Sequence, residues 1–136
     1  MNEHDQTRAS GKAHLAALRW KNPAPGGCER DSEVWIDVAR LDAAWQASDS
    51  YIGRGGTGDA IAGRYEKFGN WVIGKDRVIE MPTICIDNGI LEFTDGRHRF
   101  AWLRDHGVKH IPVAVDPDSL SQVSVQFWSN EGDEND

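Results

Sequence analysis

Phe93 to Phe100 reads Phe-Thr-Asp-Gly-Arg-His-Arg-Phe, and this stretch decides the fold because it joins a strand to a helix. Before it, Asp87-Asn88-Gly89 separates two short apolar runs, and Asn-Gly is a strong hairpin signal because both turn residues need positive φ. After it, His98 to His106 has a helical composition up to Gly107, a natural helix stop. The sequence therefore predicts a hairpin, a tight turn at Gly96 and a helix.

A further strand follows this helix, because apolar residues alternate at positions 111, 113 and 115. The strand, helix and strand of residues 93–115 predict a compact right-handed crossover, with the turn at the carboxyl end of its strand. Ligands commonly bind at such a place.

The upstream residues supply the remaining elements. Residues 34–38 alternate as a strand does, and Leu41 and Trp45 then share one helical face. A second amphipathic helix is predicted from apolar residues at positions 61, 65, 68 and 72. Residues 120–128 alternate and are predicted as a strand, with a helix as the alternative. The expected fold class is α+β, a single compact domain with a small mixed sheet and flanking helices.

Length and composition fit one domain, since the chain has 136 residues of which 39% are hydrophobic. Residues 1–9 are polar, and we expect them to be disordered. Residues 10–32 are predicted to hold a short helix, from Ser10 to Trp20, and a linker. The main domain is expected over residues 33–128, and residues 129–136 are expected to form an acidic, disordered tail.

Charge and cysteine content exclude several classes of protein. Fifteen Lys and Arg against 22 Asp and Glu give a net charge of -7, which disfavours extensive nucleic-acid binding. Cys28 and Cys85 are far apart and have no CxxC partner, so neither a disulfide framework nor a zinc ribbon is predicted. The polar first ten residues do not resemble a signal peptide, and no apolar run approaches the roughly 20 residues of a membrane span. We expect a cytoplasmic protein that does not interact with membranes.

The turn at Gly96 carries the chemistry that the sequence predicts. The first N–H groups of a helix have no partner inside it and point at an anion placed there. Arg97 and Arg99 add forked donors suited to phosphate oxygens, and His98 adds a donor that titrates near neutrality. Positive charge in a first turn opposes the helix dipole unless an anion or a carboxylate compensates it. The alternative is structural, with Asp95 or the threonine before it as the helix N-cap and the arginines as a solvated first turn.

A second loop, residues 53–58, has four glycines in six residues and precedes a helix. One interpretation of the loop is a second phosphate-facing nest, with these candidate binding residues: Arg54, Gly55, Gly56 and Thr57. It is not a Walker A sequence, because it lacks the Gly-Lys-Ser/Thr ending. A mobile lid or a plain flexible loop is the alternative.

No protein metal site is predicted. His106 and His110 are four residues apart, but Gly107 breaks the helix that would align them. The tryptophans at positions 35, 45, 71 and 102 are expected in core and rim packing, since no basic stripe runs beside them.

The box Asp95 to Arg99, together with Gly107 and Ile111-Pro112-Val113, resembles the ParB/sulfiredoxin-like superfamily. It is similar to the Gly-Glu-Arg-Arg box of ParB N-terminal domains, and more so to the Asp-Gly-His-His-Arg box of ParB-like free serine kinases and the Gly-Gly-Cys-His-Arg box of sulfiredoxins. The resemblance implies that Gly96, Arg97, His98 and Arg99 bind nucleotide phosphates. It also implies that Asp95 is a catalytic acid/base or a group beside a metal.

The departures from this pattern narrow the function. Sulfiredoxins place their reactive cysteine where Arg97 stands, so sulfinic-acid reduction is excluded. ParB proteins have Glu there, and the absence of a recognisable helix-turn-helix argues against a chromosome-segregation clamp. Glu33 is the candidate for the upstream catalytic glutamate of the serine kinases.

Three functions follow from these observations. The first is binding of a nucleotide or other phosphorylated ligand at residues 93–100, with phosphoryl transfer or hydrolysis that uses a nucleoside triphosphate and Mg²⁺. The second is a non-catalytic accessory or sensor protein of a plasmid or phage, whose pocket senses a nucleotide or touches a partner protein. The third is a ParB-like nuclease, which ranks lowest because no paired metal-binding carboxylates are evident.

Overall fold

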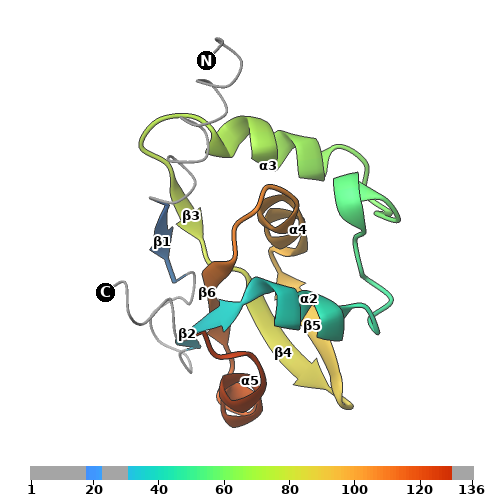
Figure 1. Ribbon diagram of the computed structural model, residues 1–136, viewed down its shortest axis with the longest axis vertical. Helices are drawn as coiled ribbons and strands as arrows, with labels where there is room; N and C mark the ends of the chain where they lie inside the picture. The colour runs from blue at the N-terminus through green and yellow to red at the C-terminus, as the bar shows by residue number, and fades with distance from the viewer. Residues whose placement is uncertain (1–17, 23–30, 130–136) are drawn as a thin grey trace.

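The computed structural model describes residues 18–22 and 31–129 of the chain (Figure 1). Its elements, in chain order, are β1 (Arg19–Lys21), β2 (Ser32–Asp37), α2 (Val38–Trp45), the 3₁₀ turn η1 (Arg54–Gly56), α3 (Arg64–Val72), β3 (Val78–Glu80), β4 (Thr83–Asp87), β5 (Ile90–Asp95), α4 (Arg97–Asp105), β6 (His110–Val115) and α5 (Leu120–Phe127). The expectations for residues 1–9, for most of 10–32 and for the tail after Ser129 lie outside the described residues.

The described strands form two sheets. The larger has four strands in the order β2-β6-β4-β5, with β2 antiparallel to β6, β4 antiparallel to β5, and β4 parallel to β6. The smaller is a parallel pair, β1 with β3. The prediction of an α+β domain with a small mixed sheet and flanking helices is confirmed.

The predicted direct crossover between β5 and β6 is wrong. β4 lies between these strands, and because it is antiparallel to β5 and parallel to β6, β5 and β6 run in opposite directions. The Asn88-Gly89 turn makes β5 the hairpin partner of β4 and leaves the other edge of β4 free for β6. The turn at Gly96 still follows the carboxyl end of β5.

Two assignments of secondary structure also change. Residues 120–127 form helix α5 and not a strand, because the residues that bury are Val123 and Phe127, four apart, while Val125 is 82% exposed. The apolar residues of this stretch fit both the alternation of a strand and the spacing of a helix, and the helix is the form that buries Val123 and Phe127. Trp20 lies in strand β1 and not at the end of a helix, so the predicted helix from Ser10 is wrong at this end.

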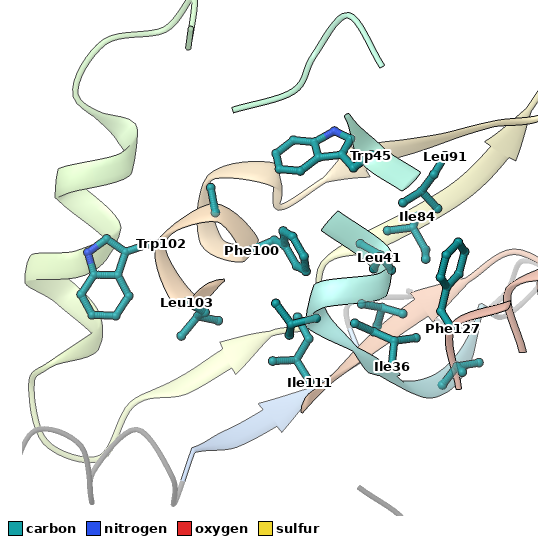
Figure 2. Close-up of a cluster of buried hydrophobic side chains, with 14 of the residues drawn as sticks. Ile36, Leu41, Trp45, Ile84, Leu91, Phe100, Trp102, Leu103, Ile111 and Phe127 are labelled. Atoms are coloured by element: carbon teal, nitrogen blue, oxygen red, sulfur yellow. The ribbon is translucent and has the colours of Figure 1, made fainter. Parts of the chain in front are cut away.

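The core lies between the larger sheet and the helices that cover it (Figure 2). Trp45 is fully buried and meets Phe93 and Phe100 edge-on, with ring centroids 4.7 and 5.7 Å away. The prediction that tryptophans pack in the core and rim fits Trp45 and Trp102, which are buried, and Trp71, which is 39% exposed.

Helix α3 packs on α4 and not on the sheet, so α4 lies between α3 and the larger sheet (Figure 1). The contact is close, because a Cβ atom on Gly69 of α3 would lie 2.1 Å from Nε1 of Trp102 of α4. The first turns of both helices face a common cleft, described below. Among the described residues, no helix has the length and apolar character needed to cross a membrane.

Candidate functional site

The turn at Gly96 joins β5 to α4 in a conformation that favours glycine, with φ at 87°. A Cβ atom there would lie 2.8 Å from Cα of Pro82 and 2.7 Å from Nη2 of Arg99. The missing side chain thus makes room for the protein's own atoms. Gly96 is required both by its dihedral angles and by this packing.

The start of α4 has no side-chain cap among the described residues. The hydroxyl of Thr94 donates to the carbonyl of Thr83 at 3.1 Å, and Asp95 contacts Arg99. The structural alternative, in which one of these residues is the N-cap, is therefore not observed. The first N–H groups of α4 keep their capacity to bind an anion.

A cleft of about 330 Å³ opens at this turn. Its lining residues come from the starts of α3 and α4 and from the turn between β5 and α4: Arg64, Lys67, Phe68, Asp95, Gly96, His98 and Arg99. Three of them are lysine or arginine and one is acidic, so the cleft is locally basic although the chain carries a net charge of -7. A local basic site thus exists on a chain that is acidic overall.

Arg99 is held at the edge of the cleft by two contacts. Its Nε donates to the carbonyl of Glu80 at 3.1 Å, and its Nη2 lies 3.4 Å from Oδ2 of Asp95. The side chain of Arg99 is 21% exposed, whereas that of Asp95 is 62% exposed. Arg99 is thus partly ordered before any ligand arrives, and Asp95 lies on the solvent side of the cleft.

Arg97 and His98 face a carboxylate that the sequence interpretation did not select, that of Asp59. Oδ2 of Asp59 lies 2.8 Å from Nε2 of His98, and Oδ1 lies 3.9 Å from Nη2 of Arg97. Oδ1 also accepts the backbone N–H of Ile61 at 3.0 Å, so both oxygens of this carboxylate are oriented. Asp59 thus compensates the positive charge that Arg97 brings to the first turn of α4. Arg97 itself is not among the residues that line the cleft.

Burial lowers the pKa of His98 below its ordinary value, although the nearby carboxylate of Asp59 acts to raise it. The side chains of His98 and Asp59 are 12% and 6% exposed. His98 is therefore neutral near pH 7. A signal in the sequence could have found Asp59, because it is the acid that directly follows the glycine loop.

The glycine loop lies along α4 and meets its far end. The N–H of Gly55 donates to Oδ2 of Asp105, the last residue of α4, at 2.9 Å. The hydroxyl of Thr57 donates to the carbonyl of Arg54 within the loop, at 3.1 Å. Of the described residues that line the cleft, none comes from positions 53–58. The binding role of Arg54, Gly55, Gly56 and Thr57 remains a prediction.

A buried ion network fastens this loop and α3 to α4. Nη1 of Arg104 lies 2.9 Å from Oδ1 of Asp42, and its Nε lies 2.8 Å from Oδ1 of Asp105. The hydroxyl of Tyr65 donates to Oδ2 of Asp105 at 2.7 Å. Burial and this hydrogen bond raise the pKa of Tyr65 to about 12. Burial acts to raise the pKa of Asp105, but the hydrogen bonds from Arg104, Tyr65 and Gly55 outweigh it and hold that pKa below its usual value.

Other sequence candidates lie elsewhere. Glu33 is exposed on β2 and accepts the indole N–H of Trp35 at 3.1 Å, and it is not among the residues that line the cleft. The ring of His106 stacks on Trp102 with centroids 3.7 Å apart, and Nδ1 of His110 lies 2.6 Å from the hydroxyl of Ser129. Within residues 18–22 and 31–129, no three His, Cys, Asp or Glu residues are grouped so as to hold a metal ion.

Arg64 and Lys67 are the basic residues of the cleft that sequence reasoning missed. They lie three apart at the start of α3 and so share one helical face. That spacing was readable, but the sequence did not indicate that α3 packs beside the start of α4.

Comparison with known proteins gives the fold alone. No protein-family model matches the chain, and no curated protein matches its sequence. Among solved structures, the fold is similar to that of the Oncogenic Suppression Activity Protein, described as a plasmid fertility inhibition factor and crystallised as a gold(I) cyanide derivative. The similarity has a TM-score of 0.55 at 17% sequence identity and covers 90% of this chain and 84% of that one.

Proposed function

We propose that this chain is a ParB/sulfiredoxin-like domain that binds a nucleotide or other phosphorylated ligand in the cleft between the starts of α3 and α4. The observation that carries the proposal is the gathering of Arg64, Lys67 and Arg99 around the uncapped start of α4. Cations converging on free helix N–H groups suit a phosphate, because both provide donors to its oxygens. Each charge-assisted hydrogen bond contributes about 1.5–3 kcal/mol before desolvation is subtracted.

The proposed chemistry is phosphoryl transfer or hydrolysis of a nucleoside triphosphate. Asp95 lies at the rim of the cleft, where its carboxylate has access to a phosphate or to Mg²⁺ carried in with the phosphates. Mg²⁺ commonly binds through one or two carboxylates together with substrate oxygens, so a protein cage is not required. Reduction of a sulfinic acid is not part of the proposal, because Arg97 stands where that chemistry needs cysteine.

Calorimetric titration of ATP, ADP, CTP and GTP, each with and without MgCl₂, tests the proposal. We expect saturable nucleotide binding, and each substitution that removes a basic side chain of the cleft should lower the affinity. Lys67→Ala is such a substitution. The matched control is Lys75→Ala, which removes the same charge from an exposed residue outside the cleft and should leave affinity unchanged. Equal affinities of the two variants, or no binding to the parent protein, would reject the cleft as a phosphate site.

The second candidate function is a non-catalytic accessory or sensor protein of a plasmid or phage that uses the same cleft. The fold similarity to a plasmid fertility inhibition factor favours it. Phosphate release distinguishes the two functions. An enzyme should turn over, and Asp95→Asn should lower its rate with affinity nearly intact. A sensor should bind the same nucleotides, lose them with Arg99→Ala, and release no phosphate.

A further inference from the structure

Asp59 and His98 form a buried acid–histidine pair beside the cleft. Oδ2 of Asp59 lies 2.8 Å from Nε2 of His98, and the two side chains are 6% and 12% exposed. His98 lines the cleft, whereas Asp59 approaches it from the end of the glycine loop. His98 therefore lies between the cleft and the carboxylate of Asp59.

A backbone hydrogen bond orients the carboxylate of Asp59. Its Oδ1 accepts the N–H of Ile61 at 3.0 Å, which leaves Oδ2 directed at His98. The direction of Nε2 does not meet hydrogen-bond geometry with any described atom, but at 2.8 Å from a carboxylate oxygen an unprotonated Nε2 would be repelled by that oxygen, so a neutral imidazole carries its hydrogen on Nε2. The other ring nitrogen, Nδ1, is then unprotonated and able to accept a proton.

We propose that His98 is the proton acceptor for nucleoside triphosphate hydrolysis in this cleft, and that Asp59 is the positioning residue that selects its tautomer. The inference rests on the proposed function, since it needs a triphosphate in the cleft. Asp95 was the candidate for this role in the sequence. His98 is better held, because its ring faces an oriented carboxylate while Asp95 is 62% exposed.

The oxygen of a water molecule forms a bond to the terminal phosphorus, and the bond from that phosphorus to the bridging oxygen breaks. The bridging oxygen leaves with the electron pair on the nucleoside diphosphate. The proton of the water passes to Nδ1 of His98, and the resulting imidazolium returns it to solvent before the next turnover.

The charges that face His98 set its working pH range. Asp59, from the glycine loop, raises the pKa of His98, whereas Arg97 and Arg64, from α4 and α3, lower it, and burial lowers it most. The other charged residues of the cleft are Lys67, Asp95 and Arg99. Because the histidine must be neutral to accept a proton, activity should be present at neutral pH and lost as pH falls through a value below the ordinary 6.5 of histidine.

The experiment measures phosphate release from Mg-ATP between pH 4.5 and 8.5, and separately the affinity for a non-hydrolysable ATP analogue. Asp59→Asn should lower kcat by up to about 100-fold, because it removes the residue that selects the tautomer of the general base, with analogue affinity unchanged or tighter. Its amide can also donate to Nε2 and favour the tautomer with hydrogen on Nδ1. The acidic limb of the remaining activity should move to lower pH, because the anion that raised the histidine pKa is gone.

Two further variants and a control complete the design. His98→Asn should lower kcat by about 100-fold or more, the usual contribution of a general base. Asp59→Glu keeps a carboxylate and should recover part of the lost rate. Asp49→Asn makes the same charge change at an exposed residue outside the cleft and should leave kcat and the pH profile as in the parent protein.

The outcomes separate the two proposals. If the parent protein binds neither ATP nor its analogue, the proposed function fails and this inference fails with it. If the parent protein binds ATP but Asp59→Asn keeps the kcat and acidic limb of the parent, only the inference fails. If Asp59→Asn does not fold, the parent's own profile decides, because a rate that stays level from pH 7.5 to 4.5 rules out a histidine proton acceptor. Binding without any phosphate release also overturns the inference.

Discussion

Gly96→Ala tests the packing of the strand-to-helix turn on which the cleft depends. At φ of 87° an added Cβ costs about 1–2 kcal/mol from the left-handed conformation alone. At Gly96 the same Cβ would also lie 2.8 Å from Cα of Pro82, which is backbone and cannot swing aside. Overpacking of this kind adds about 1–3 kcal/mol, so the expected loss of unfolding free energy is about 2–5 kcal/mol.

Gly107→Ala is the matched control. Gly107 has φ of 85°, but nothing lies within 4 Å of the position its Cβ would take. It therefore carries the conformational cost, about 1–2 kcal/mol, without the overpacking. Urea unfolding of both variants and the parent protein gives the two losses, provided that the m-values agree. If Gly96→Ala is no more destabilising than Gly107→Ala, the close packing of Gly96 against Pro82 does not exist in solution.

Three further predictions concern charged residues. Arg99→Ala should weaken binding of a phosphorylated ligand by about 1.5–3 kcal/mol in calorimetry, while Arg77→Ala, outside the cleft, should not. Arg104→Met should lower the unfolding free energy by about 3–5 kcal/mol in urea unfolding, because it removes the cation that pairs with two partly buried carboxylates. The control is Arg40→Met, on the exposed face of α2. A loss for Arg104→Met no larger than that of the control would contradict the ion network. Because the pKa of His98 is lowered in the folded state, protonation favours the unfolded chain. Stability from this source is present above pH 6.5 and lost below it, so His98→Gln should reduce the difference in unfolding free energy between pH 7.5 and 5.5.

The sequence was most informative where local rules act. The Asn88-Gly89 turn, the strand ending at Asp95 and the helix starting after Gly96 follow from turn and cap preferences of a few neighbouring residues. Helix α5 was mistaken for a strand because apolar residues 123, 125 and 127 satisfy alternation while 120, 123 and 127 satisfy helical spacing. Only tertiary burial, which leaves Val125 in solvent, decides between the two.

The candidate site was predictable in part for a related reason. Asp95, Gly96, His98 and Arg99 share one turn and line the cleft, so local sequence identified them together. Three further residues of the site come from other elements: Arg64, Lys67 and Asp59. Their positions depend on how α3 and the glycine loop pack against α4, and α4 lies far from both in the sequence, so local sequence patterns could not predict them.

The contact of Gly69 with Trp102 has a consequence for which ligands the cleft admits. One wall of the cleft belongs to α3 and the other to α4, and these helices meet where a single methyl group on residue 69 would overlap the indole. The width of the opening is therefore set by the absence of a side chain at Gly69, two residues along α3 from Lys67. Alanine or serine at this position would force the helices apart and admit larger ligands without altering any residue that touches them.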